Sequence, residues 1–118
     1  MALTARMVTI DCTDPLALAK FWSEAAGYEI KWRHEDAFLI LGPVTGDGVG
    51  IGLQRVAEAR SGKNRAHIDW HADDRAAEVA RLAALGASVV AEHGTPAFAW
   101  TVLADPEGNE FCVSDAHG

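Results

Sequence analysis

The sequence contains few cysteines, and this excludes several kinds of protein. Only two of its 118 residues are cysteine, Cys12 and Cys112. Two cysteines cannot build a disulfide framework, and they cannot form a cysteine-rich zinc cluster by themselves. We do not expect them to pair with each other, because strand alternation places them on opposite sheet faces.

Basic residues and long apolar runs are also scarce. The chain has 10 basic and 17 acidic residues, a net charge of −7, and no basic stripe. It would repel a nucleic-acid backbone and is better suited to a neutral or cationic small molecule. A membrane-spanning run of about 18 apolar residues is missing, and the first ten residues lack a signal peptide's apolar stretch. We therefore expect a cytoplasmic protein with no nucleic-acid or membrane partner.

Apolar residues, by contrast, are plentiful enough for one core. Hydrophobic residues make up 49% of the chain, which excludes extensive disorder. The length fits one domain and is too short for two, so we predict a single domain over residues 1–118.

The chain also shows an internal duplication. Asp14 and Gly27 bracket one segment, and Asp73 and Gly86 bracket another of the same length. The two brackets are 59 residues apart, which is half of the chain. This spacing predicts two repeat units, at about residues 1–59 and 60–118.

Each bracketed segment is predicted to be a short amphipathic helix that ends at its glycine. Asp14 is a suitable N-cap with Pro15 in the first helical position, and Asp73 or Asp74 would cap the second helix. Apolar residues recur at helical spacing in both segments. They are Leu18, Phe21, Trp22 and Ala25, then Ala76, Val79, Ala80 and Ala83, with Leu82 and Leu85 widening the second face.

Short strands are predicted around both helices. Apolar and polar residues alternate over 7–12 and 67–71, a pattern typical of a strand with one apolar face. Three more short strands follow each helix, separated by Gly- and Pro-rich turns. Their approximate ranges are 28–33, 37–42 and 48–55, then 87–92, 99–104 and 110–114. The predicted fold is α+β, with a βαβββ unit used twice.

Three motifs in this pattern resemble a known superfamily. They are Asp14-Pro15 leading to Phe21-Trp22, the stretch Asn64-Arg65-Ala66-His67-Ile68-Asp69, and the closing stretch from Leu103 to Phe111 with its Asp-Pro-Glu-Gly-Asn turn. Together they resemble the vicinal oxygen chelate superfamily of glyoxalase I, extradiol dioxygenases, and fosfomycin- and bleomycin-resistance proteins. The second motif resembles its glyoxalase-like branch. The resemblance implies curled mixed sheets with helices on the convex side and ligands in the concave cup.

The implied cup assigns a direction to the alternating side chains. The apolar partners Val8, Ile10, Val49, Ile51, Leu53, Ile68 and Trp70 should face helices. The opposite residues should line the cup: Met7, Thr9, Asp11, Gly50, Gly52, Gln54, His67, Asp69, His71, Glu110, Cys112 and Ser114. From these we select Asp11, Gly50, Gly52, Gln54, His71 and Cys112 as ligand-binding candidates. We add Trp100, since tryptophan suits flat organic ligands, although the sequence leaves its register open.

Several candidates also have an ordinary structural interpretation. Gly50 and Gly52 would leave room for a ligand, or they mark a bulge or close packing. Cys112 is either a nucleophile or, more simply, a packed side chain.

The resemblance implies four metal-ligand positions, and only one keeps a suitable residue. His67 occupies the fifth-strand position, whereas Met7, Gly52 or Gln54, and Cys112 occupy the other three. We therefore expect no standard Fe, Mn or Ni centre and no resident cofactor. A divalent metal held with His67 remains an alternative, for example with Asp11, Asp69 and His71, although His67 and His71 are too far apart along one strand to share an ion without a bulge.

His67 is the main catalytic candidate, with Asp69 and Glu110 as carboxylates that would favour its protonated form. The alternative is a buried histidine that bonds across strands.

Two candidate functions follow from these observations. The first is binding of a small aromatic or cationic organic molecule, as in resistance or sequestration proteins. The second is a lyase, isomerase or dioxygenase-like enzyme that uses His67. The resemblance also implies a homodimer, because family cups are commonly closed between chains.

Overall fold

The chain divides into two compact units with the same architecture. A computed structural model describes residues 3–95 and 98–115. The units are Met1–Arg60 and Ser61–Gly118. The first contains β1 (Met7–Cys12), α1 (Pro15–Ala26), β2 (Tyr28–His34), β3 (Phe38–Pro43) and β4 (Gly50–Arg55). The second contains β5 (Asp69–Ala72), α2 (Arg75–Leu85), β6 (Ser88–Thr95), β7 (Phe98–Ala104) and β8 (Glu110–Asp115). Neither helix in the described part of the chain is long and apolar enough to cross a bilayer.

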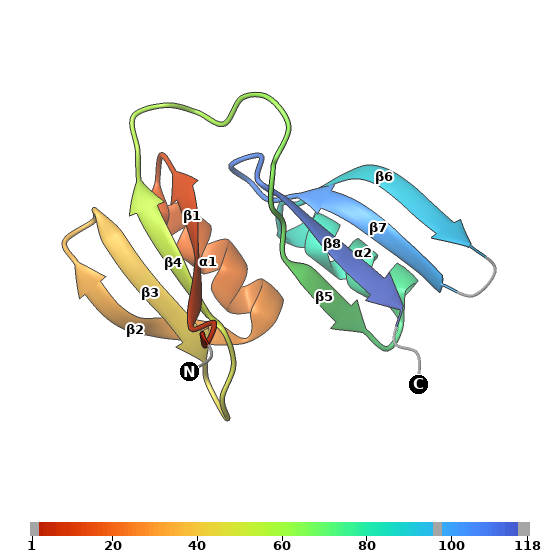
Figure 1. Ribbon diagram of the computed structural model, residues 1–118, viewed down its shortest axis with the longest axis horizontal. Helices are drawn as coiled ribbons and strands as arrows, with labels where there is room; N and C mark the ends of the chain where they lie inside the picture. Colours follow the sequence, from red (N-terminus) through yellow and green to blue (C-terminus); the bar gives the residue numbers. More distant parts are fainter. Residues whose placement is uncertain (1–2, 96–97, 116–118) are drawn as a thin grey trace. The chain divides into compact units, whose positions relative to one another are not determined.

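Each unit forms one four-stranded mixed sheet with a helix against it (Figure 1). The strand orders are β1-β4-β3-β2 and β5-β8-β7-β6, so the two sheets have the same topology. In each sheet the first strand pairs in parallel with the last, and the other pairs are antiparallel. The predicted fold class, two βαβββ units with mixed sheets, is confirmed.

The predicted caps explain where both helices begin and end. Asp14 accepts a hydrogen bond from the Ala17 backbone N–H at 3.2 Å, and Gly27 ends α1 in the left-handed region with φ 69°. In the second unit Asp74, rather than Asp73, is the cap, and it accepts from the Ala77 N–H at 3.1 Å.

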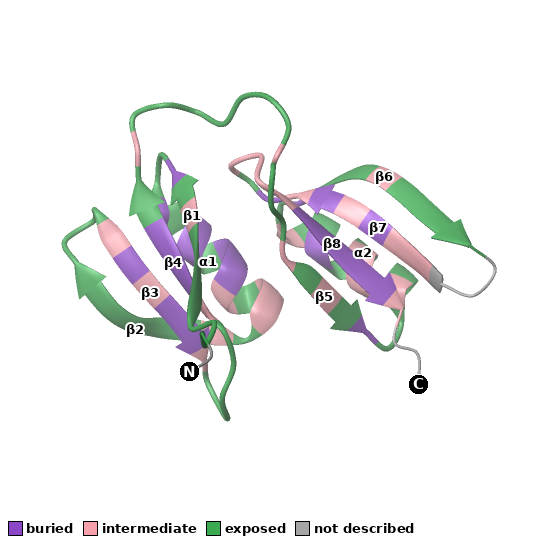
Figure 2. Ribbon diagram, in the orientation of Figure 1, coloured by how far each residue is buried: buried purple, intermediate pink, exposed green. Residues whose placement is uncertain are grey.

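Each helix covers the apolar face of its own sheet. In the first unit Leu18, Phe21 and Trp22 of α1 are buried. On the sheet, Leu39 and Leu41 of β3 and Ile51 and Leu53 of β4 are almost completely buried. In the second unit Leu82 of α2 is buried, as are Leu103 of β7 and Phe111 and Val113 of β8. Figure 2 shows that β2 and β6, one of the two edge strands of each sheet, are mostly exposed.

The helix-facing predictions fail at several positions. Val8 is 40% exposed on the edge strand β1, and Val49 is 44% exposed because it precedes β4. In α2 the three alanines Ala76, Ala80 and Ala83 are exposed. The larger residues predicted for the same face are covered: Leu82 is buried, and Val79 and Leu85 are half-buried. Larger side chains gain more from burial than alanine, so they decide which side of the helix faces the sheet.

Candidate functional site

Strand pairing in the second unit aligns polar side chains across one face of the sheet. His71 lies opposite Ser114, Ser114 opposite Trp100, and Trp100 opposite His93. A second row runs from Asp69 to Cys112 and on to Val102. Because side chains alternate along a strand, both rows project from the same face.

These rows form the wall of a cavity of about 560 Å³. Its lining residues are Lys63, His67, Asp69, His71, His93, Trp100, Val102, Glu110, Cys112 and Ser114. The structure therefore brings together six of the predicted site residues: His67, Asp69, His71, Trp100, Glu110 and Cys112. Their roles in catalysis or binding remain predictions. The volume is within the usual range for a small-molecule site.

Sequence reasoning missed three lining residues. His93 lies one residue beyond the predicted strand 87–92, whereas β6 continues to Thr95. Continuing the alternation would have found it, since Trp100 and His93 are cross-strand partners. Lys63 lies between the predicted strands 48–55 and 67–71, where no local pattern indicated a site. Val102, which is apolar, gave no polar signal.

Three side chains at the cavity wall are in close contact. His67 lies just before β5, and its Nδ1 is 3.0 Å from Asp69 Oδ1. The same Nδ1 is 3.7 Å from Cys112 Sγ on β8. A backbone hydrogen bond from Cys112 N–H to the Ile68 carbonyl, at 2.9 Å, continues the strand pairing beyond Asp69. This bond keeps His67 beside the first residues of β8.

The surroundings of Cys112 keep its thiol protonated. The side chain is only 5% exposed, and burial raises the pKa of the thiol above its usual value. The negative charge of Asp69 and a hydrogen bond to that carboxylate raise the pKa further, as does the charge of Glu110. In the metal-free protein Cys112 is therefore poorly suited to be a nucleophile, which requires a thiolate.

An aromatic pair also lines the cavity. The rings of His93 and Trp100 are stacked, with centroids 5.4 Å apart and an interplanar angle of 28°. Trp100 is half-buried, so part of its indole is available beside the cavity. The structure thus settles the register that the sequence left open for Trp100.

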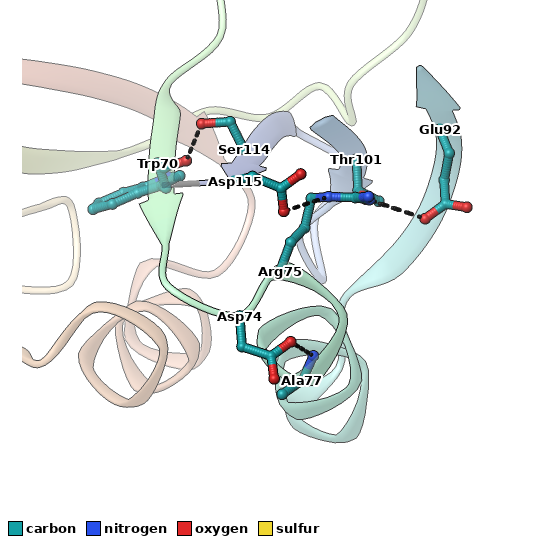
Figure 3. A network of polar contacts seen from close by, with 8 residues as sticks. All are labelled: Trp70, Asp74, Arg75, Ala77, Glu92, Thr101, Ser114 and Asp115. Atoms are coloured by element: carbon teal, nitrogen blue, oxygen red, sulfur yellow. Dashed lines mark hydrogen bonds and ion pairs between the residues drawn. The ribbon is translucent and has the colours of Figure 1, made fainter. Parts of the chain in front are cut away.

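A polar network on the helix side of the sheet holds these strands in place. The Arg75 guanidinium donates to Thr101 Oγ1 at 2.6 Å and to Asp115 Oδ1 at 3.2 Å (Figure 3). It also lies 3.4 Å from Glu92 Oε1. Arg75 begins α2, while its partners are on β7, β8 and β6. The network therefore connects the helix to three strands of the cavity wall.

The closing Asp-Pro-Glu-Gly-Asn motif positions the start of β8. Asp105 is buried, and its Oδ1 accepts from the backbone N–H groups of Glu107 and Asn109 at 2.9 and 3.0 Å. Gly108 adopts φ 88°, which a residue with a side chain rarely does. This tight turn places Glu110 at the edge of the cavity.

The remaining ligand-binding candidates, Asp11, Gly50, Gly52 and Gln54, lie in the first unit and not among the residues that line this cavity. Asp11 and Gln54 are exposed and are partners on the paired strands β1 and β4. The two glycines do not leave an open floor. A Cβ at Gly52 would lie 2.8 Å from Thr9 Oγ1 and about as close to two neighbouring side chains. Close packing therefore explains Gly52, and a Cβ at Gly50 would meet backbone carbonyls at 3.3 and 3.4 Å.

Comparison with known proteins agrees with this architecture. A family model described as a glyoxalase-like domain matches residues 7–114. Among solved structures, a glyoxalase/bleomycin resistance protein/dioxygenase family enzyme from Burkholderia phytofirmans PsJN is 22% identical, with a TM-score of 0.77 over 98% of this chain and 100% of that one. No curated protein matches the sequence.

Two further structural neighbours have named ligands or roles. TnmS3, an antibiotic binding protein from Streptomyces sp. CB03234, is 20% identical, with a TM-score of 0.73 over 99% of both chains. The fosfomycin resistance protein FosX from Listeria monocytogenes, in complex with Mn(II), is 12% identical, with a TM-score of 0.80 over 99% of this chain and 92% of that one. The fold and the family match define the class: the chain belongs to the glyoxalase-like domain family of the vicinal oxygen chelate superfamily.

Proposed function

We propose that the protein binds a small aromatic or cationic organic molecule in the cavity of its second unit, as a resistance or sequestration protein does. The observation that carries this proposal is the composition of the cavity wall. It combines a half-buried indole, Trp100, with two carboxylates, Asp69 and Glu110. Indoles attract flat rings and cations, and carboxylates add attraction for positive charge. TnmS3, an antibiotic binding protein with the same fold, supports a binding role of this kind.

A fluorescence titration with the planar cation proflavine tests this proposal. The change Trp100→Ala should weaken proflavine binding about tenfold, the equivalent of ~1.4 kcal/mol of lost stacking and cation–π attraction. Trp32→Ala is the matched control, because Trp32 is 52% exposed on β2 of the first unit. Equal losses in both variants, or no saturable binding, would contradict the assignment to this cavity. The uncharged analogue acridone separates the two attractions, and it should bind more weakly than proflavine if the carboxylates contribute.

The second candidate function is a lyase, isomerase or dioxygenase-like enzyme that uses His67. The specific observation in its favour is the 3.0 Å contact between His67 Nδ1 and Asp69 Oδ1. A carboxylate in this position orients the imidazole ring, as acid–base catalysis requires. The test is turnover of a substrate of a related lyase, isomerase or dioxygenase. Activity that is lost in His67→Ala and reduced in Asp69→Asn would favour this function over binding alone.

A further inference from the structure

Three kinds of donor atom, a nitrogen, an oxygen and a sulfur, lie close together in the cavity wall. A ring nitrogen of His67, a carboxylate oxygen of Asp69 and the sulfur of Cys112 all lie within 4.8 Å of one another. The register Asp69↔Cys112 between β5 and β8 makes two of them direct neighbours. This set replaces the combination of Asp11, His67, Asp69 and His71 considered from the sequence. Neither Asp11 nor His71 belongs to the group of donors that converges in the described structure.

The geometry of the three groups does not suit a catalytic relay. In a cysteine–histidine–carboxylate relay, one ring nitrogen faces the thiol and the other faces the carboxylate. Here the same atom, His67 Nδ1, is the one close to both Asp69 and Cys112. The three donor atoms therefore lie close enough together to bind one metal ion.

The residues of this chain do not fit the Fe, Mn or Ni centre that the resemblance implies. The resemblance assigns ligand positions to Met7 and to Gly52 or Gln54 in the first unit, and none of these residues offers a carboxylate or an imidazole. Gly52 is closely packed by neighbouring side chains and cannot gain a ligand. At the fourth position the thiol of Cys112 stands in place of the expected carboxylate. Sulfur ligands select thiophilic ions, whereas Mn²⁺ prefers carboxylate and water oxygens.

We propose that His67, Asp69 and Cys112 form a zinc site contained within the second unit. Imidazole, thiolate and carboxylate are the three ligand types that Zn²⁺ prefers, and three protein ligands leave a position for water or for a ligand atom. The His67 and Asp69 side chains are 48% and 70% exposed, so an ion can reach them from solvent, while Cys112 provides a buried anchor. The nearby carboxylate of Glu110 adds negative charge. This site does not depend on the proposed binding of an organic molecule.

Metal titration of the purified, chelator-treated protein tests the site. Co²⁺ should bind with one ion per chain and give a thiolate-to-cobalt charge-transfer band, and Zn²⁺ should displace it. Zn²⁺ affinity is then measured by competition with a chromophoric chelator, and Mn²⁺ binding by the loss of the free-ion electron paramagnetic resonance signal. We expect Zn²⁺ to bind at least about a hundredfold more tightly than Mn²⁺, because the thiolate favours the softer ion.

Substitutions of single metal-binding residues test whether the named residues hold the ion. Cys112→Ser should abolish the charge-transfer band and weaken Zn²⁺ binding at least about tenfold. Asp69→Asn changes an exposed side chain, so it should leave the fold intact and still weaken Zn²⁺ binding. Cys12→Ser is the matched control, since Cys12 is also buried but lies in the other unit. The charge-transfer band should persist in this variant. A band that survives in Cys112→Ser, Zn²⁺ affinity unchanged in both ligand variants, or Mn²⁺ binding as tight as Zn²⁺ binding would overturn the proposal.

Discussion

His67 is exposed enough to act on a ligand and close enough to its neighbours to be oriented by them. About half of its side chain is accessible, and its contacts are the exposed Asp69 and the buried Cys112. This differs from the buried cross-strand histidine that was one interpretation of the sequence. Truncating an exposed side chain costs little folding energy, so a change in function can be measured without a change in fold.

We predict that His67→Ala weakens proflavine binding more than His34→Ala, with the free energy of unfolding changed by less than about 0.5 kcal/mol. His34 is the control because it stacks on Trp32 in the first unit. His93 is unsuitable as a control, since it lines the cavity. The measurement is a binding titration beside thermal melting of each variant. A lower melting temperature with normal binding would show that His67 is only structural.

Tyr28 makes the stability of the first unit sensitive to high pH. Its hydroxyl donates to the Val49 carbonyl at 2.7 Å, and burial raises the pKa of the phenol above its usual value of 10.0. A raised folded-state pKa means that the unfolded chain loses this proton first. The stabilisation is therefore complete below about pH 10 and is lost as the pH rises through the folded-state pKa.

Tyr28→Phe should accordingly lower the free energy of unfolding by about 1 kcal/mol at neutral pH and flatten its decline above pH 10. Urea unfolding of both proteins at several alkaline pH values measures the two slopes. Identical slopes would show that other groups cause the alkaline loss.

At the scale of the elements, helix caps and strand pairing have different consequences. Asp14 and Asp74 hold the first turns of α1 and α2 through hydrogen bonds to backbone N–H groups three residues further along the chain. Arg75, in contrast, connects α2 to three strands of the cavity wall. The cap determines where the helix begins, and the network determines where it lies on its sheet.

We predict that Asp74→Ala lowers the free energy of unfolding by about 1 kcal/mol, because the Ala77 N–H loses its acceptor. Asp73→Ala is the matched control, since Asp73 is adjacent and exposed but does not cap the helix, and its effect should stay below about 0.5 kcal/mol. Chemical denaturation of the two variants measures the difference. Equal effects would mean that general charge near α2 matters more than the cap.

At the scale of the whole molecule, both sheets end in exposed strands. Ile30 and Trp32 on β2, and Val89 and Val90 on β6, expose between 42% and 52% of their surface. Exposed apolar edge strands favour association. Residues 1–118 as one domain, and the pairing of two chains, both remain predictions.

We predict that the protein is a homodimer, with a mass in solution twice the 12.6 kDa of the chain. Duplicated units also permit closure within one chain, and this is the alternative. Light scattering at micromolar concentration distinguishes the two, and a monomeric mass at every concentration tested would contradict the dimer.

Much of this protein could be predicted from local patterns in its sequence. Capping aspartates, closing glycines and strand alternation act over only a few residues, and they were sufficient to predict both βαβββ units. Alternation also predicted that His67, Asp69 and Cys112 would share one sheet face. No local pattern, however, could predict that His67 and Cys112, 45 residues apart, would come within 3.7 Å. That contact depends on the register between β5 and β8. The same non-local packing placed His93 beside Trp100 and filled the space above Gly52, because strand register and side-chain packing follow from the core of each unit as a whole.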